Sequence, residues 1–132
     1  MQKNNNNWDI YNKKYKILKY KKMTTELQFA VIKDELTAMV DDIIRQFLND
    51  KEYDKDQAQS WCNGISDEII KALHQQQRGF KFVCTCTIFQ KGYSSMNFSS
   101  TCLWNPNNDG SVTVKYENDK LHCFVCLFGC AP

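Results

Sequence analysis

The sequence predicts an α+β domain in which two N-terminal helices pack on a four-stranded antiparallel sheet. The first observation is a change of period, because apolar residues recur at steps of three and four early on and at steps of two after residue 80. The second is a series of Asn-, Asp- and Gly-containing turns that separate short apolar runs in the last third of the chain. Helices followed by strands favour separate layers, with the helices covering one face of the sheet.

The first helix is expected from Phe29, where charged residues separate the members of an apolar stripe. That stripe comprises Phe29, Ile32, Leu36, Val40, Ile43 and Phe47. The polar stretch from Asn49 to Asp56 interrupts the pattern, and Asp54 with Gln57 resembles a capping box that opens a second helix. The second stripe comprises Trp61, Ile65, Ile69 and Leu73. Arg78-Gly79 suits the end of this helix, because Gly accepts the left-handed conformation.

The first strand is expected over Phe80 to Gln90, which is rich in aromatic and β-branched residues. One face of this strand would carry Phe82, Cys84, Cys86 and Ile88, and the other Val83, Thr85, Thr87 and Phe89. Neither face is strongly polar, so we expect this strand to be central in the sheet and covered on both sides.

Three further strands follow. Met96 to Trp104 is the most polar, with hydroxyl side chains in its middle. Asn107 to Gly110 is a strong turn signal, and its Asp-Gly pair favours a tight hairpin. The alternating strand from Ser111 to Glu117 and the apolar strand from Leu121 to Phe128 complete the sheet, joined by a turn at Asn118 and Asp119.

Length and charge divide the 132 residues into an extension and one domain. Residues 1–23 hold seven Lys and one Asp, giving 7 − 1 = +6, and residues 24–132 hold 10 basic and 14 acidic residues, giving 10 − 14 = −4. The basic charge therefore lies outside the domain, which argues against nucleic-acid binding. The extension is predicted to be disordered; an amphipathic helix carrying Trp8, Tyr11, Tyr15 and Leu18 is the alternative, and Met23 is an alternative start.

No apolar run approaches the roughly 18 residues that a membrane span needs, and no secretory signal is visible. A cytosolic protein is therefore expected, and its seven Cys are interpreted as reduced, buried small hydrophobes. Cys123 and Cys126 form a C-x-x-C, but on a strand they would point to opposite faces, and no second such pair exists. Cys84 and Cys86 share a face, which leaves a two-thiolate site as the less favoured reading.

No catalytic constellation is predicted. His122 directly precedes Cys123 on a strand and would face away from it, and His74 lies on a helix among Gln residues. No glycine-rich phosphate loop or calcium loop occurs. We therefore expect a non-enzymatic protein without metal or cofactor.

A binding function remains, because the strand from Met96 to Cys102 is polar enough to lie at a sheet edge. An unpaired edge can bind an extended peptide through backbone hydrogen bonds alone. The residues leave open the alternative that this strand pairs within the chain and that its hydroxyls only face water.

The strand half of the chain resembles the Tctex-type dynein light chains. Four blocks in the right order and spacing carry the resemblance, together with Trp61 in the second helix. The blocks are Phe82 to Lys91, Ser99 to Trp104, Asp109 to Asn118 and Cys123 to Gly129. The resemblance covers about Phe29 to Cys130, and the sequence departs from the family pattern at Gly92 to Met96 and at its last three residues.

The resemblance implies a homodimer that exchanges its second strand, here Met96 to Trp104, between subunits. It further implies that the dimer binds the dynein intermediate chain as an added strand and links cargo proteins to the motor on microtubules, in the cytoplasm. The expected peptide-binding residues, flanked by the second helix, are Asn97, Phe98, Ser99, Ser100, Thr101 and Cys102. An axonemal or ciliary light chain, a motor-independent adaptor, and a thiol redox or metal-binding protein are the alternatives.

Overall fold

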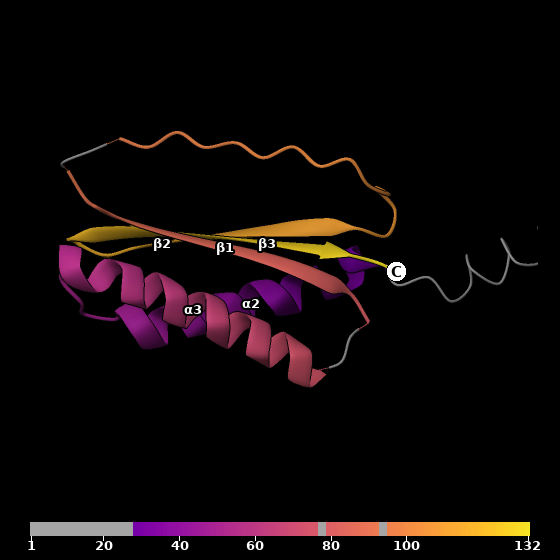
Figure 1. Cartoon of the computed structure of the whole chain (residues 1–132), viewed down its shortest axis with the longest axis horizontal. Coiled ribbons are helices and arrows are strands. Elements are labelled where there is room, and N and C mark those ends of the chain that lie inside the picture. Colours follow the sequence, from indigo (N-terminus) through magenta and orange to yellow (C-terminus); the bar gives the residue numbers. More distant parts are fainter. Residues whose placement is uncertain (1–27, 77–78, 93–94) are drawn as a thin grey trace, which may run out of the picture.

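The computed structural model describes residues 28–76, 79–92 and 95–132, so the predicted extension over residues 1–23 lies outside the described residues. Two helices cover one face of a sheet, and an extended segment runs along the other face (Figure 1). The elements are α2 (Phe29–Leu48), α3 (Lys55–Gln76), β1 (Lys81–Gln90), β2 (Gly110–Glu117) and β3 (Leu121–Cys130). This arrangement confirms the α+β class and the predicted order of helices before strands.

α2 forms where the apolar stripe predicts a helix, and its inner face is fully apolar. The buried residues are Phe29, Leu36, Val40, Ile43, Ile44 and Leu48. Ile32 and Phe47, which also belong to the predicted stripe, are only partly buried. The chain then turns at Asp50, which adopts a φ of 60°, a left-handed conformation that Asp tolerates better than most residues.

α3 begins directly after Asp54, whose Oδ1 accepts a hydrogen bond of 2.9 Å from the backbone N–H of Asp56. Asp54 is therefore the predicted N-cap. Gln57 donates its backbone N–H to the Asp54 carbonyl. Farther along, α3 approaches α2 closely at Gly64, where an added Cβ would lie 2.5 Å from the Phe47 ring. None of the described helices is long and apolar enough to cross a lipid bilayer.

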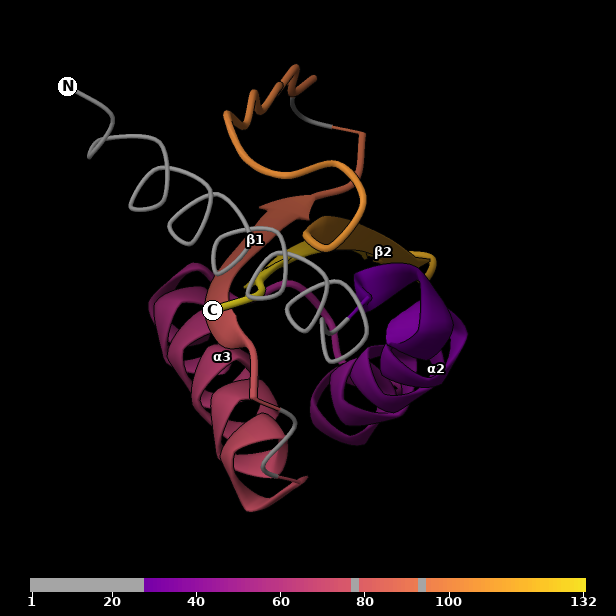
Figure 2. The same cartoon turned by 90° about the vertical axis from the view of Figure 1, so that its right-hand side faces the viewer.

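The sheet has three strands within the described residues, in the order β1-β3-β2, and both pairings are antiparallel. The prediction that β1 is the central strand is wrong for the sheet of a single chain, because β3 occupies the centre. β3 is accordingly the most completely buried strand, whereas Val83 on β1 is 58% exposed. Figure 2 shows that α3 lies beneath β1 and α2 beneath β2.

The Asp-Gly pair before β2 does not act as a hairpin turn. Gly110 does not have the positive φ that a tight hairpin turn of this type requires. It is the first residue of β2 and pairs with Gly129 of β3. An added Cβ at Gly110 or Gly129 would lie within 2.5 Å of the Phe29 ring. The two glycines are therefore needed because the first residue of α2 packs against the sheet at this point.

Candidate functional site

The outer edge of β1 has no strand partner among the described residues. Its other edge pairs with β3 over its whole length, from Lys81 opposite Cys130 to Gln90 opposite Leu121. The side chains of β1 that face the helices are only partly buried, although they pack against the core. They are Phe82, Cys84, Cys86 and Ile88. A further strand that pairs with the outer edge of β1 could bury these side chains more completely.

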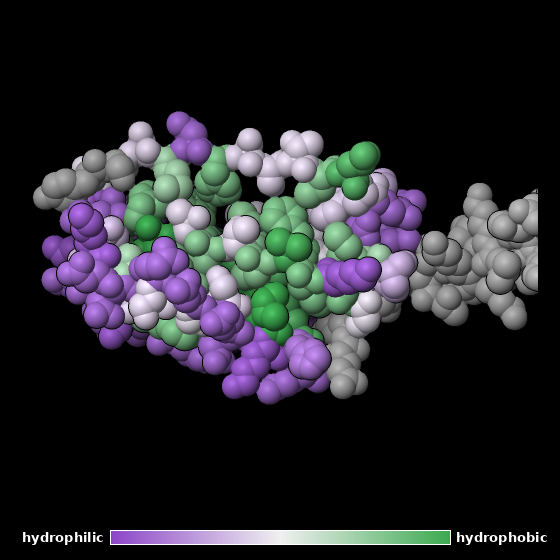
Figure 3. Space-filling view, viewed as in Figure 1, coloured by the Kyte–Doolittle hydropathy of each residue, from purple (hydrophilic) through white to green (hydrophobic). Residues whose placement is uncertain are grey.

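α3 flanks this open edge and is itself incompletely covered. Only Ile65, Ile69 and Leu73 of its 22 residues are buried. Trp61 is partly buried and Ile70 is 39% exposed. Apolar side chains gather along β1 in the middle of this side of the molecule, and hydrophilic ones along α3 below (Figure 3). We call this surface, made by β1 and α3, the β1–α3 edge.

Residues 95–104 form an extended segment that lies over the sheet face opposite the helices (Figure 1). The second of the four predicted strands, Met96 to Trp104, falls here, but this segment is not a strand of the sheet and makes no backbone hydrogen bond to the described residues. Its contacts with the sheet are aromatic. The ring of Phe98 lies 5.1 Å from that of Phe124, and the ring of Trp104 lies 6.3 Å from that of Phe128.

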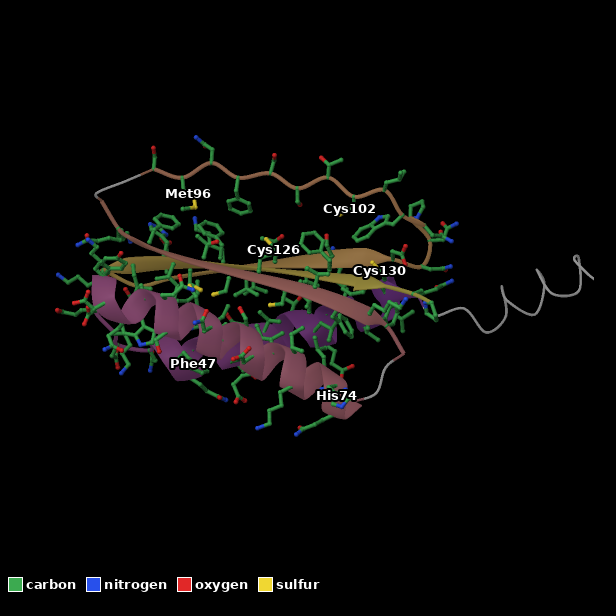
Figure 4. All side chains as sticks on the ribbon, in the orientation of Figure 1. Phe47, His74, Met96, Cys102, Cys126 and Cys130 are labelled. Carbon is green, nitrogen blue, oxygen red and sulfur yellow. The ribbon has the colours of Figure 1, made fainter. Side chains whose placement is uncertain are left out.

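Side chains alternate along this segment. Met96 and Cys102 point from it toward the sheet (Figure 4), on the same side as Phe98 and Trp104, because residues two apart share a face. Leu103 must then point away from the sheet, and its side chain is fully exposed at 105%. Full burial of such a Leu side chain would be worth about 1.5–3 kcal/mol relative to this exposed position.

The structure places all six predicted peptide-binding residues on this segment, where every one is exposed. It does not bring Asn97, Ser99 or Thr101 against α3 of the same chain, because the segment and α3 lie on opposite faces of the sheet. Leu103 was missed by the sequence reasoning, which took only the polar middle of the strand. Leu103 could have been found from its position next to Trp104 in an extended segment. Consecutive residues of such a segment point to opposite faces, so only one of these two apolar side chains can pack on the sheet.

The segment is anchored at its C-terminal end by Asp109. Its Oδ2 accepts a hydrogen bond of 2.8 Å from the N–H of Asn105, and its Oδ1 accepts one of 2.7 Å from the N–H of Ala131. One carboxylate thus holds the end of the segment to the end of β3. The position at which the segment leaves the sheet is therefore fixed.

The predicted orientation of the Cys and His side chains is confirmed. Cys123 faces the helices and Cys126 faces the opposite side, where its Sγ lies 3.8 Å from Thr113 Oγ1. His122 also lies on that side and stacks on Phe89. Its Nδ1 lies 3.3 Å from Glu117 Oε2, within ion-pair distance, but makes no aligned hydrogen bond with the described residues.

The thiols near α3 have raised pKa values, which keep them protonated at neutral pH. The pKa of Cys84 is raised to about 11 by burial, against the lowering effect of a hydrogen bond with Ser66. Cys62 has a raised pKa because of its hydrogen bond with Cys86 and its burial. Among the described residues, no three His, Cys, Asp or Glu side chains converge as metal ligands would.

An open strand edge beside a helix, together with an extended segment that pairs with no strand among the described residues, is an arrangement to which a further strand can be added. Comparison with known proteins gives the family. The model of the Tctex-1 family matches residues 30–130, and the chain belongs to that family.

Named relatives agree. A protein named "Dynein light chain Tctex-type" from Dictyostelium discoideum is 29% identical over 109 residues, which is 82% of this chain and 98% of the relative. One of the same name from Drosophila melanogaster is 30% identical over 106 residues, 80% of this chain and 94% of the relative. The human "Dynein light chain Tctex-type 3" is 26% identical over 98 residues, 74% of this chain and 84% of the relative.

Proposed function

We propose that this chain is a non-catalytic light chain of the cytoplasmic dynein motor complex. Its homodimer would bind the dynein intermediate chain as an added strand and link cargo proteins to transport along microtubules. Family membership and the names of the relatives support the light-chain role. The single observation that supports the mode of binding is the combination, in one chain, of an open β1–α3 edge and an unpaired segment over residues 95–104.

In the proposed homodimer, residues 95–104 of each chain add to the outer edge of β1 in the other chain. The segment supplies the unpaired N–H and C=O groups, and the β1 edge supplies the complementary set. Leu103, which is fully exposed at 105%, would then face the helix layer of the partner. Phe98 and Trp104 would stay packed on the sheet of their own chain, between the two sheets.

The exchanged strand has a second edge, on which the intermediate-chain peptide would bind beside α3. Asn97, Phe98, Ser99, Ser100, Thr101 and Cys102 would supply the backbone groups that pair with it. Hydroxyl side chains suit this role, because they cover little of the backbone and leave its N–H and C=O groups accessible.

Sedimentation equilibrium of the full chain, with and without a peptide of the dynein intermediate chain, tests the proposal. We expect a dimer that binds one peptide per subunit. Ser100→Pro removes one backbone N–H from the middle of the segment and should weaken peptide binding at least tenfold. Ser95→Pro, at the edge of the segment, is the control. A monomeric chain, or a dimer whose peptide affinity is unchanged by Ser100→Pro, would contradict the proposed mode of binding.

A further inference from the structure

Two thiol contacts fix how α3 lies beneath β1 (Figure 2). Cys62 of α3 forms a hydrogen bond with Cys86 of β1, and Ser66, about one turn later, forms one with Cys84. One helical turn advances about 5.4 Å, and two strand residues advance about 6.6 Å. Each further turn of α3 therefore passes about two residues of β1, and residue numbers rise in opposite directions in the two elements.

The flank of α3 that turns away from α2 lies beside the open edge of β1. Gly64 packs against Phe47 of α2, Ile65 is buried in the core, and Ser66 lies under β1. Each helical residue is turned by about 100° from the one before it, so three side chains follow within about 60° beyond Ser66. These side chains, all exposed, are those of Gln59, Asn63 and Ile70.

This flank changes from polar to apolar along the helix. Gln59 Nε2 donates a 2.9 Å hydrogen bond to Asn63 Oδ1, and this amide pair is level with Cys86 of β1. Ile70, one turn after Ser66, is level with Phe82. About nine helical residues, or about 13 Å, separate the middle of the amide pair from Ile70. A strand that lies over this flank should therefore present a polar and an apolar side chain about 13 Å apart.

Residues 95–104 carry such a pair. Ser99 and Leu103 lie on the face that points away from the sheet of their own chain, and four strand residues span about 13 Å. With Ser99 over the amide pair and Leu103 over Ile70, the segment runs antiparallel to β1, as the two pairings within the sheet also do. The parallel direction would place Leu103 over the amides and polar side chains over Ile70.

We propose that residues 95–104 of one chain pair antiparallel with β1 of the other in a single register, in which Leu103 is opposite Phe82 and contacts Ile70 of the partner. The inference rests on the homodimer proposed above and names the residues that specify it. The numbers of paired residues add up to 185 (103 + 82 = 185). In this register residues 95–104 cover β1, Lys81–Gln90, from end to end.

The same register pairs exposed apolar residues on the other face of the strand. Cys102 is exposed and would lie opposite Val83, which is 58% exposed, since 102 + 83 = 185. Met96, 44% exposed, would lie opposite Phe89. A shift by two residues would separate both pairs and uncover one end of β1. A shift by one residue would turn Leu103 away from α3.

Val83→Cys tests the register, because it places a thiol opposite the native Cys102 of the partner. Directly opposite Cα atoms of antiparallel strands are about 4.5–5.5 Å apart, which a disulfide can span. After treatment of the full chain with oxidised glutathione, we expect a covalent dimer and a cross-linked peptide that joins position 83 to Cys102. Thr87→Cys, on the same face of β1 but about 13 Å farther along, is the matched control that should not link to Cys102. Cys102→Ser should abolish the link in the Val83→Cys variant.

Sedimentation equilibrium of the same proteins separates two kinds of failure. A dimer in which position 83 does not link to Cys102, or in which Thr87→Cys links equally well, would overturn the register and leave the proposed homodimer standing. A monomeric wild-type chain would overturn both.

The contact between Leu103 and Ile70 has its own test. Leu103→Ala and Ile70→Ala should each raise the dissociation constant of the dimer. Because the two residues lose the same contact, the double variant should raise it about fivefold less than the product of the single effects. Val31→Ala, at an exposed residue of α2, is the control, and its effect should multiply with that of Leu103→Ala. Simple multiplication for Ile70 as well would overturn the contact.

Discussion

The two edges of the sheet are built differently, although each lies above a helix. On β2, above α2, the residues that face the helices are Val112, Val114 and Tyr116, and all are buried. On β1, above α3, the corresponding residues are only partly buried. α2 buries six of its 20 residues and α3 only three of its 22. Both β1 and β2 are edge strands of the three-stranded sheet, but among the described residues the helix-facing side chains of β2 are buried and those of β1 are not fully covered.

The chemistry of the two edges differs in the same sense. Next to β2, Arg45 lies over the Tyr116 ring at 5.3 Å and pairs with Asp41 at 2.8 Å, so that an ion pair lies beside this strand. Charges of this kind discourage the addition of a further strand. Next to β1, the flank of α3 carries Ile70 and Trp61. Partly exposed apolar side chains of α3 therefore lie beside β1, whereas an ion pair of α2 lies beside β2.

The largest expected effect follows from Leu103. Leu103→Asp should raise the dimer dissociation constant by about 10²- to 10⁴-fold, because each dimer would lose two buried Leu side chains worth about 1.5–3 kcal/mol each. Val31→Asp, at another exposed apolar residue, is the control, and sedimentation equilibrium is the measurement. Equal dimerisation of both variants would mean that the β1 edge is not completed by residues 95–104.

A smaller effect is expected on the central strand β3, from Gly129→Ala. The added Cβ would lie 2.5 Å from two ring atoms of Phe29, and the resulting strain should lower the free energy of unfolding by about 1–3 kcal/mol. Urea denaturation measures it. The double variant with Phe29→Leu should recover part of the loss, since the smaller side chain leaves space; full additivity of the two losses would contradict the packing explanation.

Asp109→Ala should lower the free energy of unfolding by about 1–2 kcal/mol, because two backbone N–H groups lose their acceptor. Dimerisation should weaken as well, since the carboxylate fixes where residues 95–104 leave the sheet. Asp119→Ala, in an exposed turn, is the matched control. A change in stability with an unaltered dissociation constant would restrict Asp109 to a role within the subunit.

The elements that depend on local pattern could be predicted from the sequence. The α2 stripe, the Asp54 cap and the opposite orientations of Cys123 and Cys126 follow from periodicity and local hydrogen bonding alone. The position of β1 in the sheet could not be predicted in this way. Its two apolar faces indicate a covered strand, but they do not say whether the cover comes from the same chain.

Gly110 illustrates a second limit. Asp109-Gly110 has the composition of a hairpin turn, yet the glycine is required by Phe29, which is 81 residues away in sequence (110 − 29 = 81). Such a contact leaves no local signal. The predicted peptide-binding residues are likewise located on one exposed segment by the structure, but no strand among the described residues pairs with them, so their role remains a prediction.

The smallest expected effect is a loss of stability at alkaline pH, which comes from the buried thiol of Cys84 on β1. The pKa of Cys84, beside the open edge, is raised in the folded state from 9.0 to about 11 by burial. The folded thiol therefore holds its proton where the unfolded thiol has lost it, so its contribution to stability is complete below pH 9 and disappears as the pH rises toward 11. Unfolding midpoints in urea at pH 8 and pH 10.5 should show this loss, and Cys84→Ser should reduce it. The same loss in wild type and variant would mean that other groups carry the alkaline instability. In that case burial would not raise the pKa of the Cys84 thiol, and Cys84 would contribute nothing to the alkaline stability of the β1–α3 edge.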